Sequence, residues 1–237
     1  ADALYLSGDR RAIPTLMEVA KSGFVKSGGE QASDLRASAA IALARIAGPE
    51  TYDAFKALVD KETAAAGVFG MALDRMQVAK DCGEDINCYG KTLKDPSWTR
   101  AEKAAFAIAF SGNAKQGLPL LLGAMQPITA MAQDRYPVHQ AILFGLTRLG
   151  SRDCHECIEK LNAQVAKDEK AVRLPGARDL LGETRVAEAI IENQGANDVV
   201  AANAATAVAE ETPAPAAKGK GKAAKAGKAK GGKKKHR

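Results

Sequence analysis

Residues 34–48 read DLRASAAIALARIAG, and this stretch decides the fold. Leu35, Ala39, Leu43 and Ile46 recur at the three- and four-residue spacing that places side chains on one face of a helix. Five of the other eleven positions are alanine, which is the strongest helix former and allows helices to approach closely. The stretch therefore predicts a helix that buries one narrow face against neighbouring helices.

The ends of this helix carry their own signals. Ser33 or Asp34 can cap its start, because a short polar side chain accepts a hydrogen bond from the first turn. Gly48 can end it in the left-handed conformation, which costs glycine nothing. The chain would then reverse, and a second helix with Tyr52 and Phe55 on its inner face would pack back antiparallel.

This arrangement of a long run, a glycine and a shorter run recurs along the chain. The glycines at Gly8, Gly48, Gly83, Gly112 and Gly150 are 40, 35, 29 and 38 residues apart, and each is expected to turn the chain in the left-handed conformation. An irregular period of this length predicts a right-handed α-solenoid of about five helix hairpins, each burying its face only against its neighbours. The expected helices are one capped by Asp9 and others at 35–47, 52–59, 64–80, 85–93, 101–110, 114–125, 138–149, 153–165 and 177–192.

The composition supports an all-α body followed by a different C-terminal region. Apolar residues make up 46% of the 237 residues and aromatic ones only 5%, and no run alternates as a strand would. We expect a solenoid over residues 1–193 and a disordered linker and tail over 194–237. Apolar stretches such as 104–110 are too short to span a membrane. The chain begins at Ala1, which suggests a processed form or an excerpt.

The units around Gly48 and Gly150 resemble bacterial HEAT repeats, the family that includes the HEAT-like repeats of phycobilisome lyases. The similarity rests on residues 34–48 and the helix that follows, and on residues 8–16, which resemble the second half of such a unit. Pro14 and Pro119 lie where this family often carries proline. The resemblance implies a helical solenoid whose usual role is protein binding, and it says little about activity.

The net charge of +6 is distributed unevenly along the chain. The last 26 residues hold ten basic residues and no Asp or Glu, whereas residues 1–211 hold 24 basic and 28 acidic residues. This tail resembles those of linker histones and histone-like bacterial proteins, which implies contact with nucleic acid through phosphates. An anionic membrane surface is a second interpretation, and a solvated extension a third. The polyanion-binding candidates are Lys218, Lys220, Lys222, Lys225, Lys228, Lys230, Lys233, Lys234, Lys235 and Arg237.

The four cysteines form two local pairs. Cys82 and Cys88 flank a predicted helix turn, and Cys154 and Cys157 lie one helical turn apart near a predicted helix start. Three interpretations stay open: structural disulfides in a periplasmic or extracellular protein, inert thiols in a cytoplasmic one, or a redox-active Cys154/Cys157 pair. A shared zinc site is disfavoured, because Cys88 and Cys154 lie 66 residues apart.

No residue set in the sequence indicates catalysis. His155-Glu156 is the one His-Glu pair, and Trp98, at an expected helix start, suits packing better than base recognition. We therefore predict no catalytic residues, no metal and no cofactor. The favoured function is a non-enzymatic scaffold or adaptor that grips a protein partner on one solenoid face, with weak polyanion attachment through the tail. The alternative is a thiol-dependent redox or metal-binding protein using Cys154 and Cys157.

Overall fold

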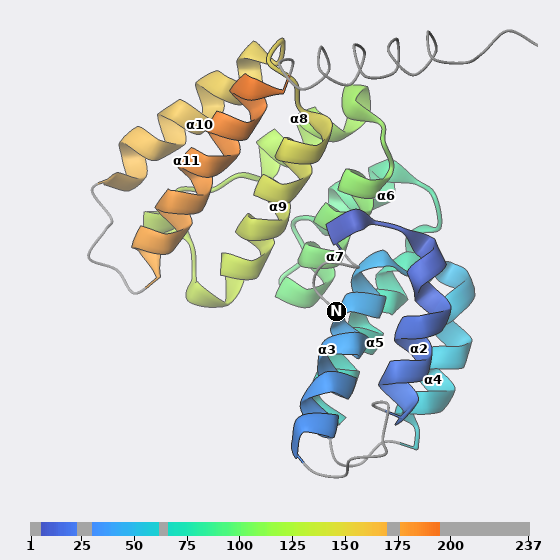
Figure 1. Ribbon diagram of the computed structural model, residues 1–237. Coiled ribbons are helices and arrows are strands. Elements are labelled where there is room, and N and C mark those ends of the chain that lie inside the picture. Colours follow the sequence, from blue (N-terminus) through green and yellow to red (C-terminus); the bar gives the residue numbers. More distant parts are fainter. Residues whose placement is uncertain (1–5, 23–29, 62–65, 170–175, 195–237) are drawn as a thin grey trace, which may run out of the picture. The chain divides into compact units, whose positions relative to one another are not determined.

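The computed structural model describes residues 6–22, 30–61, 66–169 and 176–194 (Figure 1). These residues contain helices and no strand, so the prediction of an all-α protein is confirmed. The α-helices are α2 (Ile13–Ser22), α3 (Glu30–Ile46), α4 (Tyr52–Val59), α5 (Ala66–Cys82), α6 (Ile86–Thr92), α7 (Trp98–Phe110), α8 (Ala114–Ala124), α9 (Tyr136–Leu149), α10 (His155–Asp168) and α11 (Ala177–Asn193). Short 3-10 turns are η1 (Arg10–Ala12), η2 (Pro49–Thr51), η3 (Ile128–Ala130) and η4 (Gln133–Arg135).

The expected cap at Asp9 is confirmed, and the one expected at Ser33 or Asp34 is wrong. The Asp9 carboxylate accepts from the Arg11 backbone N–H at 2.9 Å, and Asp85 accepts from Asn87 in the same way at 2.9 Å. Ser33 and Asp34, by contrast, lie inside α3, which has already begun at Glu30. The residues before them are good helix formers, so the helix extends past the polar pair that could have capped it.

The helices pair differently from the predicted hairpins. Helix α4 packs against α5, the helix that follows it, and not chiefly against α3 across the Gly48 turn. Each of the other pairs likewise joins the helix after a glycine turn to the helix that follows it. These pairs are α2–α3, α6–α7, α8–α9 and α10–α11. The predicted hairpin around Gly48 is therefore wrong. The turns at Gly48, Gly83, Gly112 and Gly150 therefore connect successive pairs rather than the two helices of one pair.

Contacts also extend beyond neighbouring units. Helices α3, α5, α7, α9 and α11 contact one another in that order, yet α3 also touches α7 directly. Near the N-terminus, the Ser7 carbonyl oxygen accepts from the Arg148 guanidinium at 3.4 Å. The expectation that each unit meets only its neighbours does not hold for the described residues.

The glycine turns are of two kinds. Gly8, Gly83 and Gly112 have φ values of +68°, +57° and +66°, so they take the predicted left-handed conformation. Gly48 is extended, with φ −91°, and Gly150 is extended with φ −74°, which corrects the prediction for both. A β-carbon at Gly48 would meet only the ends of the exposed, ion-paired Arg10 and Glu50 side chains, which can shift away from it.

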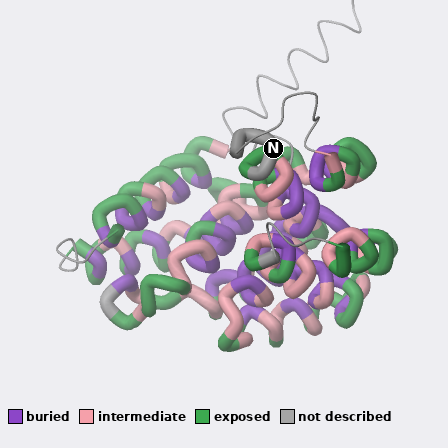
Figure 2. Tube along the Cα trace, turned by 90° about the horizontal axis from the view of Figure 1, so that it is seen from below, coloured by how far each residue is buried: buried purple, intermediate pink, exposed green. Residues whose placement is uncertain are grey.

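Besides a small cluster of Ile128, Ala177 and Leu180, the described residues form two large apolar clusters. One lies among α2 to α5 and includes Leu43, Phe55 and Phe69, and the other joins α5 to α11 around Phe106 and Leu146. Buried residues line the faces between helices, while exposed residues lie on the outside (Figure 2). Phe110, at the end of α7, packs against both clusters and connects them.

Candidate functional site

Both cysteine pairs lie at disulfide distance in the structure. Cys82, the last residue of α5, is joined to Cys88 of α6, with 5.4 Å between the Cα atoms. Cys154 is joined to Cys157, with 5.2 Å between the Cα atoms. The described residues leave no free cysteine and gather no group of three metal-ligating side chains. The arrangement agrees with two separate local bridges rather than one shared metal site.

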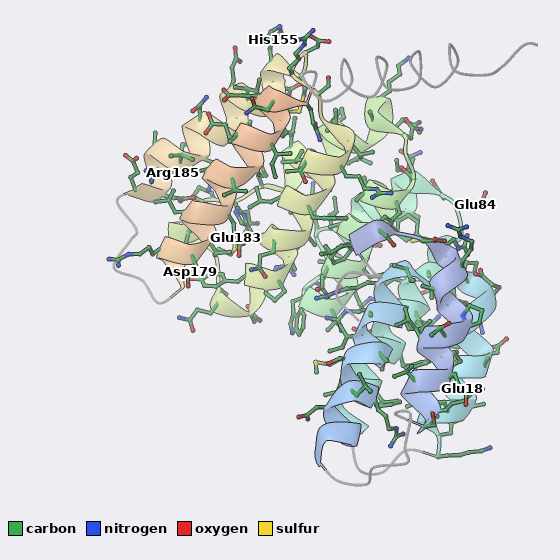
Figure 3. All side chains as sticks on the ribbon, viewed as in Figure 1. Glu18, Glu84, His155, Asp179, Glu183 and Arg185 are labelled. Carbon is green, nitrogen blue, oxygen red and sulfur yellow. A yellow bond between two sulfur atoms is a disulfide. The ribbon has the colours of Figure 1, made fainter. Side chains whose placement is uncertain are left out.

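The Cys154–Cys157 bridge is asymmetric at the start of α10. Cys154 is the N-cap residue, is half-buried, and its Sγ lies 3.3 Å from the Cys157 backbone N–H that donates to it. Cys157 is fully buried in the larger apolar cluster. The intervening residues His155 and Glu156 are both exposed, and His155 lies at the tip of the helix (Figure 3). Cys154 is thus a half-buried residue that caps the helix, whereas Cys157 is fully buried.

A buried ionic cluster, which the sequence reasoning missed, lies where α3, α5 and α7 meet. The Glu102 carboxylate, 1% exposed, receives the Arg45 guanidinium at 2.6 Å and the Arg75 Nε at 2.6 Å. Arg75 also lies over the Trp98 ring, 4.8 Å from its centroid. Trp98 therefore packs a helix start, as predicted. The overlooked signal was the Glu102-Lys103 pair in the middle of an alanine-rich helix.

Lys103 caps the end of α3. Its Nζ donates to the Arg45 carbonyl oxygen at 3.0 Å and to the Ala47 carbonyl oxygen at 2.7 Å. Burial removes water from the ammonium and lowers the pKa of Lys103 to about 7. Lys103 also lines a cavity of about 560 Å³, together with Arg10, Glu50 and Tyr89. Because the Lys103 ammonium donates its protons to carbonyl oxygens at the end of α3, we assign Lys103 a structural rather than a catalytic role.

An apolar groove of about 550 Å³ lies over α9 and α11. Val186 and Ile190 of α11 are 59% and 44% exposed there, and Leu6 is exposed beside them. A hydrogen bond of 2.8 Å from Gln140 Nε2 to Glu183 Oε1 ties the two helices at the groove. Glu183 and Arg185 can be located on α11 in Figure 3. We call these lining residues the α9–α11 groove; its floor includes Pro137, Ala141, Phe144 and Ala187.

The remaining predicted site is the polyanion-binding tail. All ten basic tail residues, Lys218, Lys220, Lys222, Lys225, Lys228, Lys230, Lys233, Lys234, Lys235 and Arg237, fall outside the described residues. Within the described ranges, no helix is both long and apolar enough to cross a membrane.

The described residues define an all-α protein with two local disulfides, a buried ionic cluster and one exposed apolar groove. No protein-family model, curated protein or solved structure matches the chain.

Proposed function

We propose that this protein is a non-enzymatic adaptor, a stack of HEAT-like helices that binds a protein partner through the α9–α11 groove. The basic tail adds weak attachment to a polyanion. The observation that carries the proposal is the exposed pair Val186 and Ile190, which are large apolar side chains on the last described helix.

The spacing of this pair explains why it suits a partner. Val186 and Ile190 are four residues apart and share one face of α11, while Leu180 and Ile191 of the same helix are buried. Helix α11 therefore has apolar residues on both its buried and its exposed face. The exposed residues line the groove, where apolar side chains of another protein can pack against them, as expected for a recognition surface.

The interior charges support a binding role over a catalytic one. Glu102 is engaged by two arginines, and Lys103 donates to two carbonyl oxygens, so these buried groups are occupied by the fold itself. The two disulfides favour an oxidising compartment, periplasmic or extracellular, for such a protein.

Site-directed photo-crosslinking tests the groove. A photoreactive residue at position 186, introduced into the full chain in its source cells, should give discrete crosslinked products. Ile190→Asp should abolish these products, because a charge would have to be buried in the contact. Ala189→Asp is the matched control, since Ala189 is exposed on α11 but does not line the groove. Equal crosslinking from positions 186 and 189, or products that survive Ile190→Asp, would exclude the groove.

Binding as a function of salt tests the tail. The full chain should bind duplex DNA or anionic vesicles with a logarithmic salt slope of up to about −9, if all ten charges engage phosphates. Replacing the nine tail lysines by glutamine should remove most of that slope. Binding that does not change would show that the tail only solubilises the protein, and comparison of DNA with vesicles identifies the polyanion.

The asymmetry of the Cys154–Cys157 bridge favours a second function, thiol–disulfide exchange. An incoming thiolate would attack the sulfur of Cys154, the less buried of the two residues, form a mixed disulfide and release Cys157 as a thiol. A second thiol then completes the exchange, so that two electrons and two protons pass to the protein and one external disulfide forms. A helix N-terminus stabilises the Cys154 thiolate.

The Cys82–Cys88 bridge is the internal control for this second function. The chain is equilibrated with glutathione at graded ratios, alkylated and analysed by peptide mass spectrometry. For an exchange function, Cys154–Cys157 should be reduced at much less reducing ratios than Cys82–Cys88. Equal resistance of the two bridges would leave both as structural and would exclude the exchange function.

A further inference from the structure

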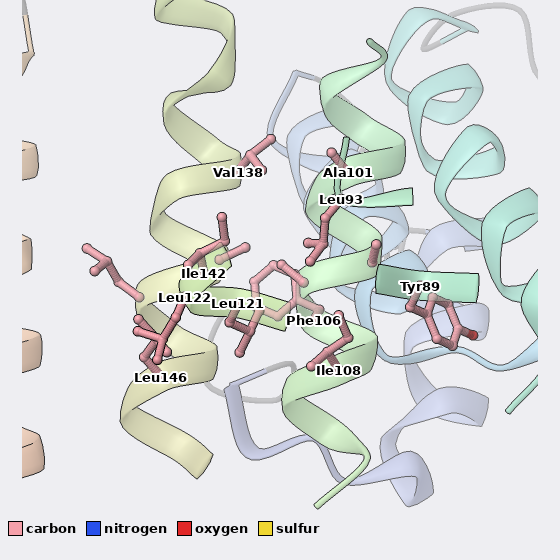
Figure 4. Packing of buried hydrophobic residues seen from close by; sticks show 14 of the residues in the cluster. Tyr89, Leu93, Ala101, Phe106, Ile108, Leu121, Leu122, Val138, Ile142 and Leu146 are labelled. Atoms are coloured by element: carbon pink, nitrogen blue, oxygen red, sulfur yellow. The ribbon is translucent and has the colours of Figure 1, made fainter. Parts of the chain in front are cut away.

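The outer face of α11 is apolar and exposed. Leu6, Val186 and Ile190 are three of the four exposed large apolar side chains among the described residues, and all three line the α9–α11 groove. On α9, the buried residues Val138 and Ile142 are turned toward α7 (Figure 4), so that side of α9 belongs to the interior and other residues of α9 line the groove. An exposed apolar cluster of this kind is typical of a surface that pairs with another molecule.

The exposed residues of α11 include a hollow and a projection. Gly182 lines the groove, and a β-carbon added there would meet no atom within 4 Å. Gly182 and Ile190 lie four residues before and four residues after Val186, so the three residues share one side of the helix. The hollow at Gly182 and the projecting side chain of Ile190 are therefore at equal distances from Val186 along α11.

A second α11, packed antiparallel about a twofold axis at Val186, would fit these two features together. Such an axis brings residue 190 of each copy opposite residue 182 of the other copy. The Ile190 side chain would then enter the hollow at Gly182 of the second copy, as side-chain ridges enter the grooves of a neighbouring helix. Because the same patch is used on both copies, the interface closes on itself and the assembly ends at a dimer.

The charges beside this face are also self-complementary. Arg178 and Glu192 are exposed on α11, fourteen residues apart and thus within about 40° of each other around the helix. They lie eight residues before and six residues after Val186, so the axis would bring each to within about 3 Å of the other's level along the helix. Arg185, nearer the axis, is already paired with Glu169 at 2.6 Å, which offsets repulsion between the two copies of Arg185.

We infer that the occupant of the α9–α11 groove is a second copy of this chain, bound by antiparallel pairing of the two α11 helices about a twofold axis at Val186. The inference rests on the proposed use of the groove as a protein-binding surface and names its partner. A dimer would also carry two basic tails, so that attachment of one tail to a polyanion raises the effective concentration of the other.

Sedimentation equilibrium of the full chain measures the association. An interface built mainly on one helix from each copy is small, so we expect a dissociation constant on the order of 10–100 µM. Gly182→Leu, which fills the hollow, and Ile190→Asp, which puts a charge into the contact, should each weaken the dimer at least about tenfold. Ala163→Leu and Ala163→Asp are the matched controls, since Ala163 is exposed on α10 outside the groove. Circular dichroism should show the same helix content in all four variants.

Cysteine crosslinking tests the twofold axis itself. The four native cysteines are all bridged, so Val186→Cys adds the one free thiol. A residue on a twofold axis meets its own copy, so mild oxidation should link position 186 to position 186, whereas Ala163→Cys should give no link. Arg178→Glu and Glu192→Arg should each weaken the dimer by about two- to tenfold, and the double variant should restore it.

A chain that stays monomeric up to about 1 mM would overturn the inference. A dimer that survives Gly182→Leu, or one that forms no link between the two copies of position 186, would overturn it as well. The proposed function is tested separately by the photo-crosslinks in cells: products that contain a different protein would support the groove and exclude the second copy as its occupant. Products that contain only this chain would support both.

Discussion

At the scale of single residues, buried charge is the main departure from an ordinary alanine-rich helix. Glu102 and Lys103 are adjacent in α7, and both are almost fully buried. Glu102 is held by Arg45 of α3 and Arg75 of α5, so its carboxylate joins three helices. Lys103 instead reaches the carbonyl oxygens that end α3. Each side chain therefore depends on partners far away in the sequence.

Removing the charge of Glu102 should destabilise the fold strongly. Glu102→Gln leaves the buried Arg75 and the largely buried Arg45 without their counter-ion, and we expect a loss of about 3–5 kcal/mol in the free energy of unfolding. Glu50→Gln is the control, because Glu50 pairs with Arg10 at an exposed position. It should cost less than about 1 kcal/mol. Equal losses in urea denaturation would contradict the structural role assigned to Glu102.

The depressed pKa of Lys103 predicts a pH dependence of stability. The folded protein releases this proton near pH 7, whereas the unfolded chain holds it up to about pH 10.5. Between these values the unfolded state binds more protons, so stability rises with pH, by up to about 1.4 kcal/mol per pH unit. Urea denaturation from pH 7 to 9.5 measures the slope.

Lys103→Met should remove this contribution to the slope, and the exposed Lys115→Met should leave it in place. The pKa of Tyr89 is raised by burial, so above about pH 10 its ionisation would destabilise the folded state and oppose the effect. The measurement therefore stops below that pH. An unchanged slope in Lys103→Met would show that Lys103 is not the titrating group.

At the scale of elements, glycine occurs in two settings: in the turns between helix pairs and inside helices. Gly112 lies between α7 and α8 with φ +66°, and a β-carbon there would meet no neighbouring atom within 4 Å. Gly70 lies inside α5, also with open space around it. The two sites differ in backbone conformation and not in crowding.

Substitution by alanine should therefore change stability in opposite directions at the two sites. Gly112→Ala should cost about 1–2 kcal/mol, because the left-handed conformation brings the β-carbon too close to the following carbonyl oxygen. Gly70→Ala should stabilise the protein by about 0.5–1 kcal/mol, because alanine favours the helix. Thermal and urea unfolding measure both changes. A loss at Gly70 would imply crowding that the structure does not contain.

At the scale of the whole described body, contacts between non-neighbouring helices should make unfolding cooperative. A stack whose units meet only their neighbours can unfold in steps. Here α3 touches α7, and Phe110 packs against both apolar clusters, 5.7 Å from the Phe144 ring and 5.9 Å from the Phe106 ring by centroids. These contacts couple the two ends of the helix series.

Two optical probes test this coupling. Trp98 is the single tryptophan and lies beside the buried ionic cluster, so its fluorescence reports on the centre, while far-UV circular dichroism reports on all helices. We expect coincident urea transitions for the native chain. Phe110→Ala should separate them by weakening the connection between the clusters. Separate transitions in the native chain would instead indicate independent units.

Local features made several parts of the structure predictable. The cap at Asp9, the helix start at Asp85 and the left-handed turns at Gly83 and Gly112 depend on a few adjacent residues. The cap expected at Ser33 or Asp34 failed because helix-forming residues lie before it. The ionic cluster of Glu102 was not predicted, because its partners are 57 and 27 residues away.

The sequence alone determined that the body is helical, where most helices run, and that its cysteines form two local pairs. These properties follow from propensity, periodicity and short spacing, which act over a few residues. Only the tertiary structure decided which helices pair, which charges meet inside, and that the Val186–Ile190 face is left exposed within the described residues. Those outcomes depend on side chains brought together from distant parts of the chain, where many pairings satisfy the same local pattern.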